Sequence, residues 1–139
     1  MRRSLLLTRD FPPVPGGISA MFLHLWRHLP SDRMLVLTPA VKGGREADSR
    51  NGYKPLRFRA PGGNMVAKAA ASLIMTFHVI ALVLFRGVRE IHAGQILSCG
   101  PVGLLAQKLF GIPCFLWLFG GETTSAYKRH PVEEWLVAT

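Results

Sequence analysis

The feature that most constrains the fold is an alternation between short apolar runs and longer segments in which apolar residues recur every three or four positions. Strands are expected at residues 4–8, 34–38, 56–59, 90–93 and 115–119, and helices at 18–29, 64–86 and 100–110. Buried strands that alternate with helices are typical of strand–helix–strand units, whose strands pair in parallel. The sequence therefore predicts an α/β fold, with an open parallel sheet and helices on both faces.

Glycine and proline mark the expected ends of these elements. Gly100 and Pro101 would place a proline in the first turn of a helix that runs to Phe110 and ends before Gly111. Residues 39–55 hold glycine pairs and charges with no period of two or 3.6, so they are expected to form a loop.

The longest apolar segment leaves three alternatives open. Residues 69–85 carry no charge, which is close to the lower limit for crossing a bilayer. Lys68, Ser72, Thr76 and Arg86 fall near one helical stripe, as expected for a buried helix that shows one narrow face to water. The pattern favours this packed helix over one that touches a membrane surface, and over a true span.

The charge balance indicates an anionic partner, and the cysteine spacing indicates a reducing compartment. The formal charge is +9 with a pI of about 10.6, which suits phosphates or acidic lipid head groups. Nucleic acid is not expected as a partner, because the basic residues are not interleaved with aromatic ones. Cys99 and Cys114 have neither disulfide nor zinc spacing, and the apolar run after Met1 is too short for a signal peptide. We expect a cytoplasmic protein, at the inner face of the membrane or free of it, with no metal and no cofactor.

Glycines and polar residues near strand ends are the candidate binding residues. Ligands of open parallel sheets collect beyond the carboxyl ends of the strands. Gly16 and Gly17 precede a helix whose free N–H groups favour a phosphate, although a turn needed only for backbone geometry explains them as well. His92, at a strand end, is either a ligand donor or base, or a structural histidine. Glu122, in a glycine turn, is either a ligand acceptor or a solvated carboxylate.

Three segments taken together resemble a known family. Residues 8–18, then 90–95, then 111–113 followed by 119–122, match in order and spacing the N-terminal domain of family-four glycosyltransferases of the GT-B fold. The resemblance covers nearly the whole chain. It implies a Rossmann-like sheet and retaining transfer of a sugar from a nucleotide-sugar donor to an acceptor hydroxyl of a surface polysaccharide or glycolipid, with no obligatory metal.

The resemblance also implies roles for the candidate residues. His92 and Glu122 would be catalytic residues of the interdomain cleft. The substrate-binding residues would be Gly16, Gly17, Gly120 and Gly121. The sequence departs from the family at Phe119, where many relatives have a histidine, and a phenyl ring cannot donate to a sugar hydroxyl. In the family a C-terminal domain holds the nucleotide through two glutamates separated by seven positions, and that motif is absent from this sequence.

The domain organisation follows from these features. Residues 1–139 are expected to be a single N-terminal, acceptor-side domain that is incomplete, because residues 133–139 read as a helix without a stop signal. Without the donor domain the chain is expected to be inactive. The sequence leaves open two other functions, a non-catalytic Rossmann-like binding or interaction module and a small membrane-associated protein.

Overall fold

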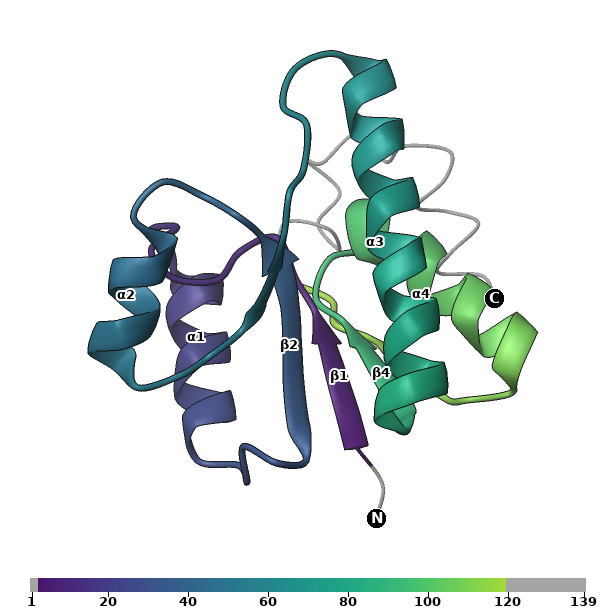
Figure 1. Cartoon of the computed structure of the whole chain (residues 1–139), viewed down its shortest axis with the longest axis horizontal. Coiled ribbons are helices and arrows are strands. Elements are labelled where there is room, and N and C mark those ends of the chain that lie inside the picture. Colours follow the sequence, from purple (N-terminus) through teal and green to yellow (C-terminus); the bar gives the residue numbers. More distant parts are fainter. Residues whose placement is uncertain (1–2, 120–139) are drawn as a thin grey trace.

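The computed structural model describes residues 3–119, in which strands and helices alternate along the chain (Figure 1). The strands are β1 (Arg3–Leu7), β2 (Met34–Pro39), β3 (Leu56–Phe58), β4 (Val88–Ala93) and β5 (Cys114–Leu116). The helices are α1 (Gly17–Arg27), α2 (Gly44–Asn51), α3 (Met65–Arg86) and α4 (Ile96–Phe110). The strands form one sheet in the order β3-β2-β1-β4-β5, and every neighbouring pair is parallel. The predicted α/β, Rossmann-like open sheet is confirmed.

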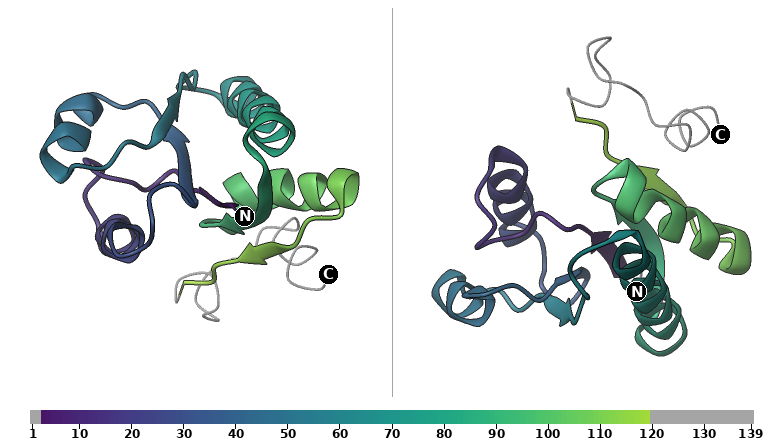
Figure 2. Two further views of the ribbon diagram at one scale, coloured as in Figure 1. Left: turned by 60° about the horizontal axis from the view of Figure 1, so that its bottom comes forward. Right: turned by 90° about the horizontal axis from the view of Figure 1, so that it is seen from above.

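Helices cover both faces of this sheet, α1 and α2 on one side and α3 and α4 on the other (Figure 2). Successive strand residues point to opposite faces. Leu6 therefore packs with Phe22 and Trp26 of α1, whereas its neighbours Leu5 and Leu7 pack toward α3 and α4. All five side chains are at most 1% exposed. Because β1 is the middle strand, its three leucines form the centre of both cores.

The expectation of a loop across residues 39–55 is wrong, because α2 occupies part of it. Gly43 before the helix and Gly52 after it are in the left-handed region, with φ of 75° and 64°. Glu46 in the first turn and Arg50 in the last match the helix dipole. Only Gly44 of this helix is buried, so the segment has no apolar period for a sequence pattern to detect.

The predicted start of α4 is also wrong, since the helix begins at Ile96 and Pro101 lies inside it. Proline lacks an N–H, and in a helix its ring crowds the carbonyl four residues earlier. The preceding turn adapts, because the Gly100 N–H donates to the Gln95 carbonyl, five residues back, at 3.0 Å. Burial of Ile96 and Cys99 stabilises this early turn.

Two strands also differ from their expected bounds. Gly87 ends α3 in the left-handed region, with φ of 66°, and β4 begins immediately after it, two residues before residue 90. The strand β5 ends at Leu116, three residues short of the expected end at Phe119. The carboxyl edge of the sheet is therefore reached earlier along β5 than the sequence indicated.

The helix α3 begins as predicted, but its exposure does not follow the prediction. The Asn64 side chain accepts from the Ala67 N–H at 3.1 Å and caps the helix. In residues 3–119 it is the one helix long and apolar enough to cross a membrane by length and composition. Only 28% of its most apolar window is buried. The expectation of a mostly buried helix with one narrow polar face is therefore wrong, because much of the surface it shows to solvent is apolar.

Candidate functional site

The strand order creates a switch point at the carboxyl edge between β1 and β4. These strands are neighbours, yet the chain leaves β1 toward α1 on one face and leaves β4 toward α4 on the other (Figures 1 and 2). In open parallel sheets the ligand binds outside the carboxyl ends of the strands at such a reversal. The loops that start at Thr8 and Gly94 are therefore the candidate site.

A polar cluster joins these two loops. The Gln95 amide donates from Nε2 to Thr8 Oγ1 and to Asp10 Oδ2, both at 3.1 Å. Its Oε1 accepts from the backbone N–H of Arg9 at 3.0 Å, and the Asp10 N–H donates to Thr8 Oγ1 at 3.1 Å. The cluster fixes the loop after β1 against the loop after β4. The sequence analysis assigned no role to Gln95, although a polar residue two positions after a buried strand was a usable signal.

Gly94 lets the two loops approach. Its N–H donates to the Leu7 carbonyl at 2.7 Å. A Cβ at this position would lie 3.0 Å from that carbonyl oxygen and 3.0 Å from the Phe22 ring. The end of β4 can therefore sit against β1 and α1 only while residue 94 has no side chain.

The glycine pair stands at the start of α1, on the same edge of the sheet. Gly16 is the N-cap, with φ 145° and ψ 159°, and Gly17 is the first helical residue. Both are exposed, and a Cβ on either would meet no atom within 4 Å. No side chain of the described residues caps this helix, so the N–H groups of its first turn lack an intrahelical acceptor. The structure thus places the positive end of a helix dipole at the carboxyl edge of the sheet, the edge that also holds the switch point.

His92 lies on the face of the sheet rather than in the loop beyond it. Its ring stacks on Phe115 with centroids 5.1 Å apart and meets the Trp26 ring edge-on. Trp117 Nε1 donates to His92 Nδ1 at 3.3 Å, so in the neutral ring the proton is on Nε2, which lies 3.6 Å from Glu90 Oε1. Both ring nitrogens therefore face groups of the chain itself. In this structure the ring packs like a structural histidine.

The remaining sequence-predicted site residues, Gly120, Gly121 and Glu122, lie outside the described residues. Phe119 is the last residue before them, and its ring meets Phe22 edge-on with centroids 5.9 Å apart. The phenyl ring at position 119 therefore packs against α1. Within residues 3–119 no group of three His, Cys, Asp or Glu side chains is arranged to hold a metal ion.

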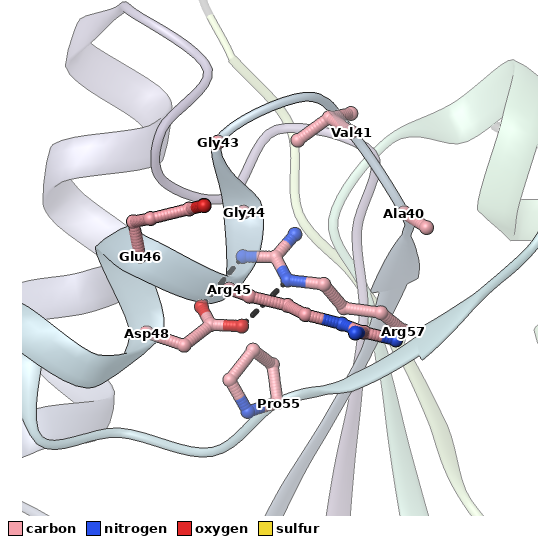
Figure 3. Close-up of a pocket in the computed structure, with 9 residues that line it drawn as sticks. All are labelled: Ala40, Val41, Gly43, Gly44, Arg45, Glu46, Asp48, Pro55 and Arg57. Atoms are coloured by element: carbon pink, nitrogen blue, oxygen red, sulfur yellow. Dashed lines mark hydrogen bonds and ion pairs between the residues drawn. The ribbon is translucent and has the colours of Figure 1, made fainter.

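A hollow of about 460 Å³ opens between the end of β2, the helix α2 and the strand β3 (Figure 3). Arg57 crosses it and donates to both carboxylate oxygens of Asp48, at 2.7 and 2.6 Å. It also donates to the carbonyls of Pro39 and Pro12, at 3.3 and 2.6 Å. Arg45 and Glu46 add one charge of each sign to the lining. Four of the five N–H donors of this largely buried arginine bind other segments, so we interpret the residues around the hollow as a structural joint.

No protein-family model and no curated protein matches this chain. The arrangement around the switch point is therefore the main guide to function.

Proposed function

We propose that the chain is the acceptor-side domain of a retaining glycosyltransferase of the GT-B fold. Its reaction would move a sugar from a nucleotide-sugar donor to a hydroxyl of a surface polysaccharide or glycolipid. The observation that carries the proposal is the open space around Gly16 and Gly17 at the start of α1, on the sheet edge that also holds the switch point. Two of the segments that resemble the family, residues 8–18 and the end of residues 90–95, therefore lie at the edge at which parallel sheets bind ligands.

The backbone at this position suits an anionic, oxygen-rich ligand. Donor N–H groups of the first turn and the helix dipole favour a diphosphate or a sugar oxygen. Glycine at position 17 lets the ligand approach the main chain, because no methyl group intervenes. Thr8, Asp10 and Gln95 hold the adjoining loops and so position this backbone.

The other candidate residues keep the roles that the resemblance implies. Glu122 would accept from a sugar hydroxyl, and Gly120 and Gly121 would line the cleft next to it. His92 would act on the reaction only after its ring left the contacts with Trp117 and Glu90. Catalysis further needs the donor phosphates held opposite the acceptor, which in this family is the work of a second domain.

Binding of inorganic diphosphate is the most direct test. In amide NMR spectra of the chain, we expect diphosphate to shift Gly17, Ile18 and Ser19, and Gly17→Val to abolish those shifts. Gly62→Val is the matched control, because a Cβ at Gly62 also meets no atom within 4 Å and that loop is remote in sequence from α1. Equal shifts in wild type and Gly17→Val would contradict the proposal.

Transfer itself tests the need for a second domain. Incubation of the purified chain with labelled nucleotide sugars and a membrane extract should give no labelled glycan above a no-protein control. Robust turnover by these 139 residues alone would overturn the two-domain mechanism.

A further inference from the structure

Both ring nitrogens of His92 face side chains, and the two contacts respond in opposite ways to a proton on the ring. Nδ1 accepts from Trp117 Nε1 at 3.3 Å, and Nε2 lies 3.6 Å from Glu90 Oε1. By contrast, His28 and His78 each place Nδ1 against a backbone carbonyl four residues earlier. Because a histidine side chain changes charge between about pH 8 and pH 5, the surroundings of His92 are suited to sense pH.

The contact between His92 and Trp117 exists only with the neutral ring. An indole has one N–H and no acceptor, so Trp117 needs the lone pair on Nδ1. In the imidazolium form both ring nitrogens carry a proton, and two N–H groups would then face each other across 3.3 Å. Protonation therefore removes the side-chain hydrogen bond that connects Trp117, directly after β5, to β4.

Two other neighbours of the ring favour its charged form. The Glu90 carboxylate attracts an imidazolium at 3.6 Å, and the Ser4 hydroxyl, which donates to Glu90 Oε1, fixes this carboxylate. The Phe115 ring stacks on His92 with centroids 5.1 Å apart, which is within the distance at which an aromatic face attracts a cation. The charged ring of His92 can therefore keep both of these contacts while it loses Trp117.

Among residues 3–119, the groups packed on the ring include no second charge. From β1 the ring is flanked by Leu6, which is apolar, and from α1 it meets the edge of Trp26. From β5 and the residue after it come two aromatic rings. Glu90 is therefore the charged group that favours one protonation state of the ring over the other.

We infer that the contact between His92 and Trp117 is a pH-sensitive latch between β4 and the end of β5. The neutral ring holds the indole, whereas the protonated ring pairs with Glu90 and releases it. The Trp117 backbone N–H stays bonded to the Ala93 carbonyl at 2.9 Å, so the release concerns the side chain and leaves the sheet intact. Trp117 precedes Gly120 by three residues in the sequence, so the latch adjoins a segment that the proposed function assigns to the cleft. The inference does not depend on transferase activity.

The indole N–H signal of Trp117 tests this inference. We expect ¹H–¹⁵N spectra of the full chain to show this signal moving as pH falls from 8 to 5, because the N–H loses its acceptor. The movement should share its midpoint with the ring-carbon signals of His92, since one proton causes both changes. Comparison with the spectrum of Trp117→Phe assigns the signal.

Two variants separate the latch from a general effect of acid. His92→Asn keeps an oxygen that can accept from Trp117 but removes the titrating ring, so its indole signal should stay in place from pH 8 to pH 5. Glu90→Gln keeps an acceptor for the Ser4 hydroxyl but removes the charge that favours the imidazolium, so its midpoint should move to lower pH. Circular dichroism at pH 8 and at pH 5 verifies that each protein is folded.

Three outcomes would overturn the inference. The first is a His92 ring that titrates while the Trp117 signal stays in place. The second is an equal movement of that signal in wild type and His92→Asn. The third is a simultaneous loss of all dispersed signals near pH 5, which would mean that acid unfolds the chain instead of releasing one side chain. None of these outcomes bears on the binding of diphosphate at Gly17, so the two proposals fail separately.

Discussion

Replacing Gly16 and Gly17 separately by alanine should give opposite changes in stability, although the two residues are neighbours and both are exposed. Gly17 is helical and has open space at its Cβ position. An alanine there restricts the unfolded chain without strain, which stabilises the fold by about 0.4–1 kcal/mol. Gly16 has φ 145° and ψ 159°, a region that only glycine occupies readily, and alanine there costs about 1–3 kcal/mol.

The two variants should therefore differ by roughly 1.5–4 kcal/mol in the free energy of unfolding. Urea unfolding followed by tryptophan fluorescence measures this difference, and Trp26, which is 1% exposed and packs on α1's own Phe22, reports on the region. Gly62→Ala is the control, because it also has open space and an ordinary φ. Equal unfolding midpoints for the Gly16 and Gly17 variants would refute the conclusion that only Gly16 has a backbone conformation that requires glycine.

The same pair of variants separates stability from function. Under the proposed function, valine at position 17 lowers turnover of the complete enzyme by an order of magnitude or more while the fold is kept. Valine at position 16 lowers turnover as well, but part of its effect comes from backbone strain. A Gly17→Val enzyme with full activity would mean that the loop is only a turn.

Four other measurements test the packing described above. Gly103→Ala places a Cβ 2.5 Å from Cys114 Sγ, so it should destabilise the wild type by about 1 kcal/mol. In a Cys114→Ala background, where that sulfur is absent, the same substitution should stabilise the fold by about 1 kcal/mol. Additive effects of the two substitutions in thermal melts would contradict this contact. Arg57→Met leaves the carboxylate of Asp48 half-buried and unpaired and should cost about 3 kcal/mol in urea unfolding, whereas a loss below about 1 kcal/mol would show that the pair is not a joint. Burial raises the pKa of the Cys99 and Cys114 thiols from 9.0 to about 11. The folded chain therefore holds these protons more tightly than the unfolded chain does. The free energy of unfolding should accordingly fall as pH rises from about 9 to about 11. Thiol alkylation at pH 8 should accordingly be slow until the chain is unfolded, and fast alkylation of the folded chain would contradict the burial of Cys99.

The sequence was sufficient where tertiary burial and local pattern agree. Leu5, Leu6 and Leu7 are apolar in a row because β1 is covered on both faces, and that run predicted a fully buried strand. The alternation predicted the sheet type because β2, β4 and β5 are each preceded by a helix with an apolar side. The apolar pattern did not predict α2, because this helix has no apolar face. Two left-handed glycines flank it, and the Asp48–Arg57 ion pair connects it to β3.

The candidate site was predicted only in part, because its side-chain directions and long-range contacts depend on the tertiary structure. Gly16 and Gly17 were singled out because they stand directly before a predicted helix at a strand's carboxyl side, although a simple turn explains them as well. His92 was placed at an edge because it is near a strand end, but strand alternation decides where a side chain points. Ile91 and Ala93 face the core under α4, so His92 between them must face the side of α1. The cluster around Gln95 joins residues more than eighty positions apart, and a single sequence does not show such a contact.

The joint at Arg57 makes distant parts of the chain open together. One guanidinium holds the carbonyl of Pro12 in the loop that leads to Gly16, the carbonyl of Pro39 at the end of β2, and the carboxylate of Asp48 in α2. Local unfolding of β3 or α2 therefore releases the loop before α1 in the same event. In native-state hydrogen exchange the backbone amides of residues 16–20 and 44–58 should thus share one opening free energy, and the order of the glycine loop depends on a strand two places away in the sheet.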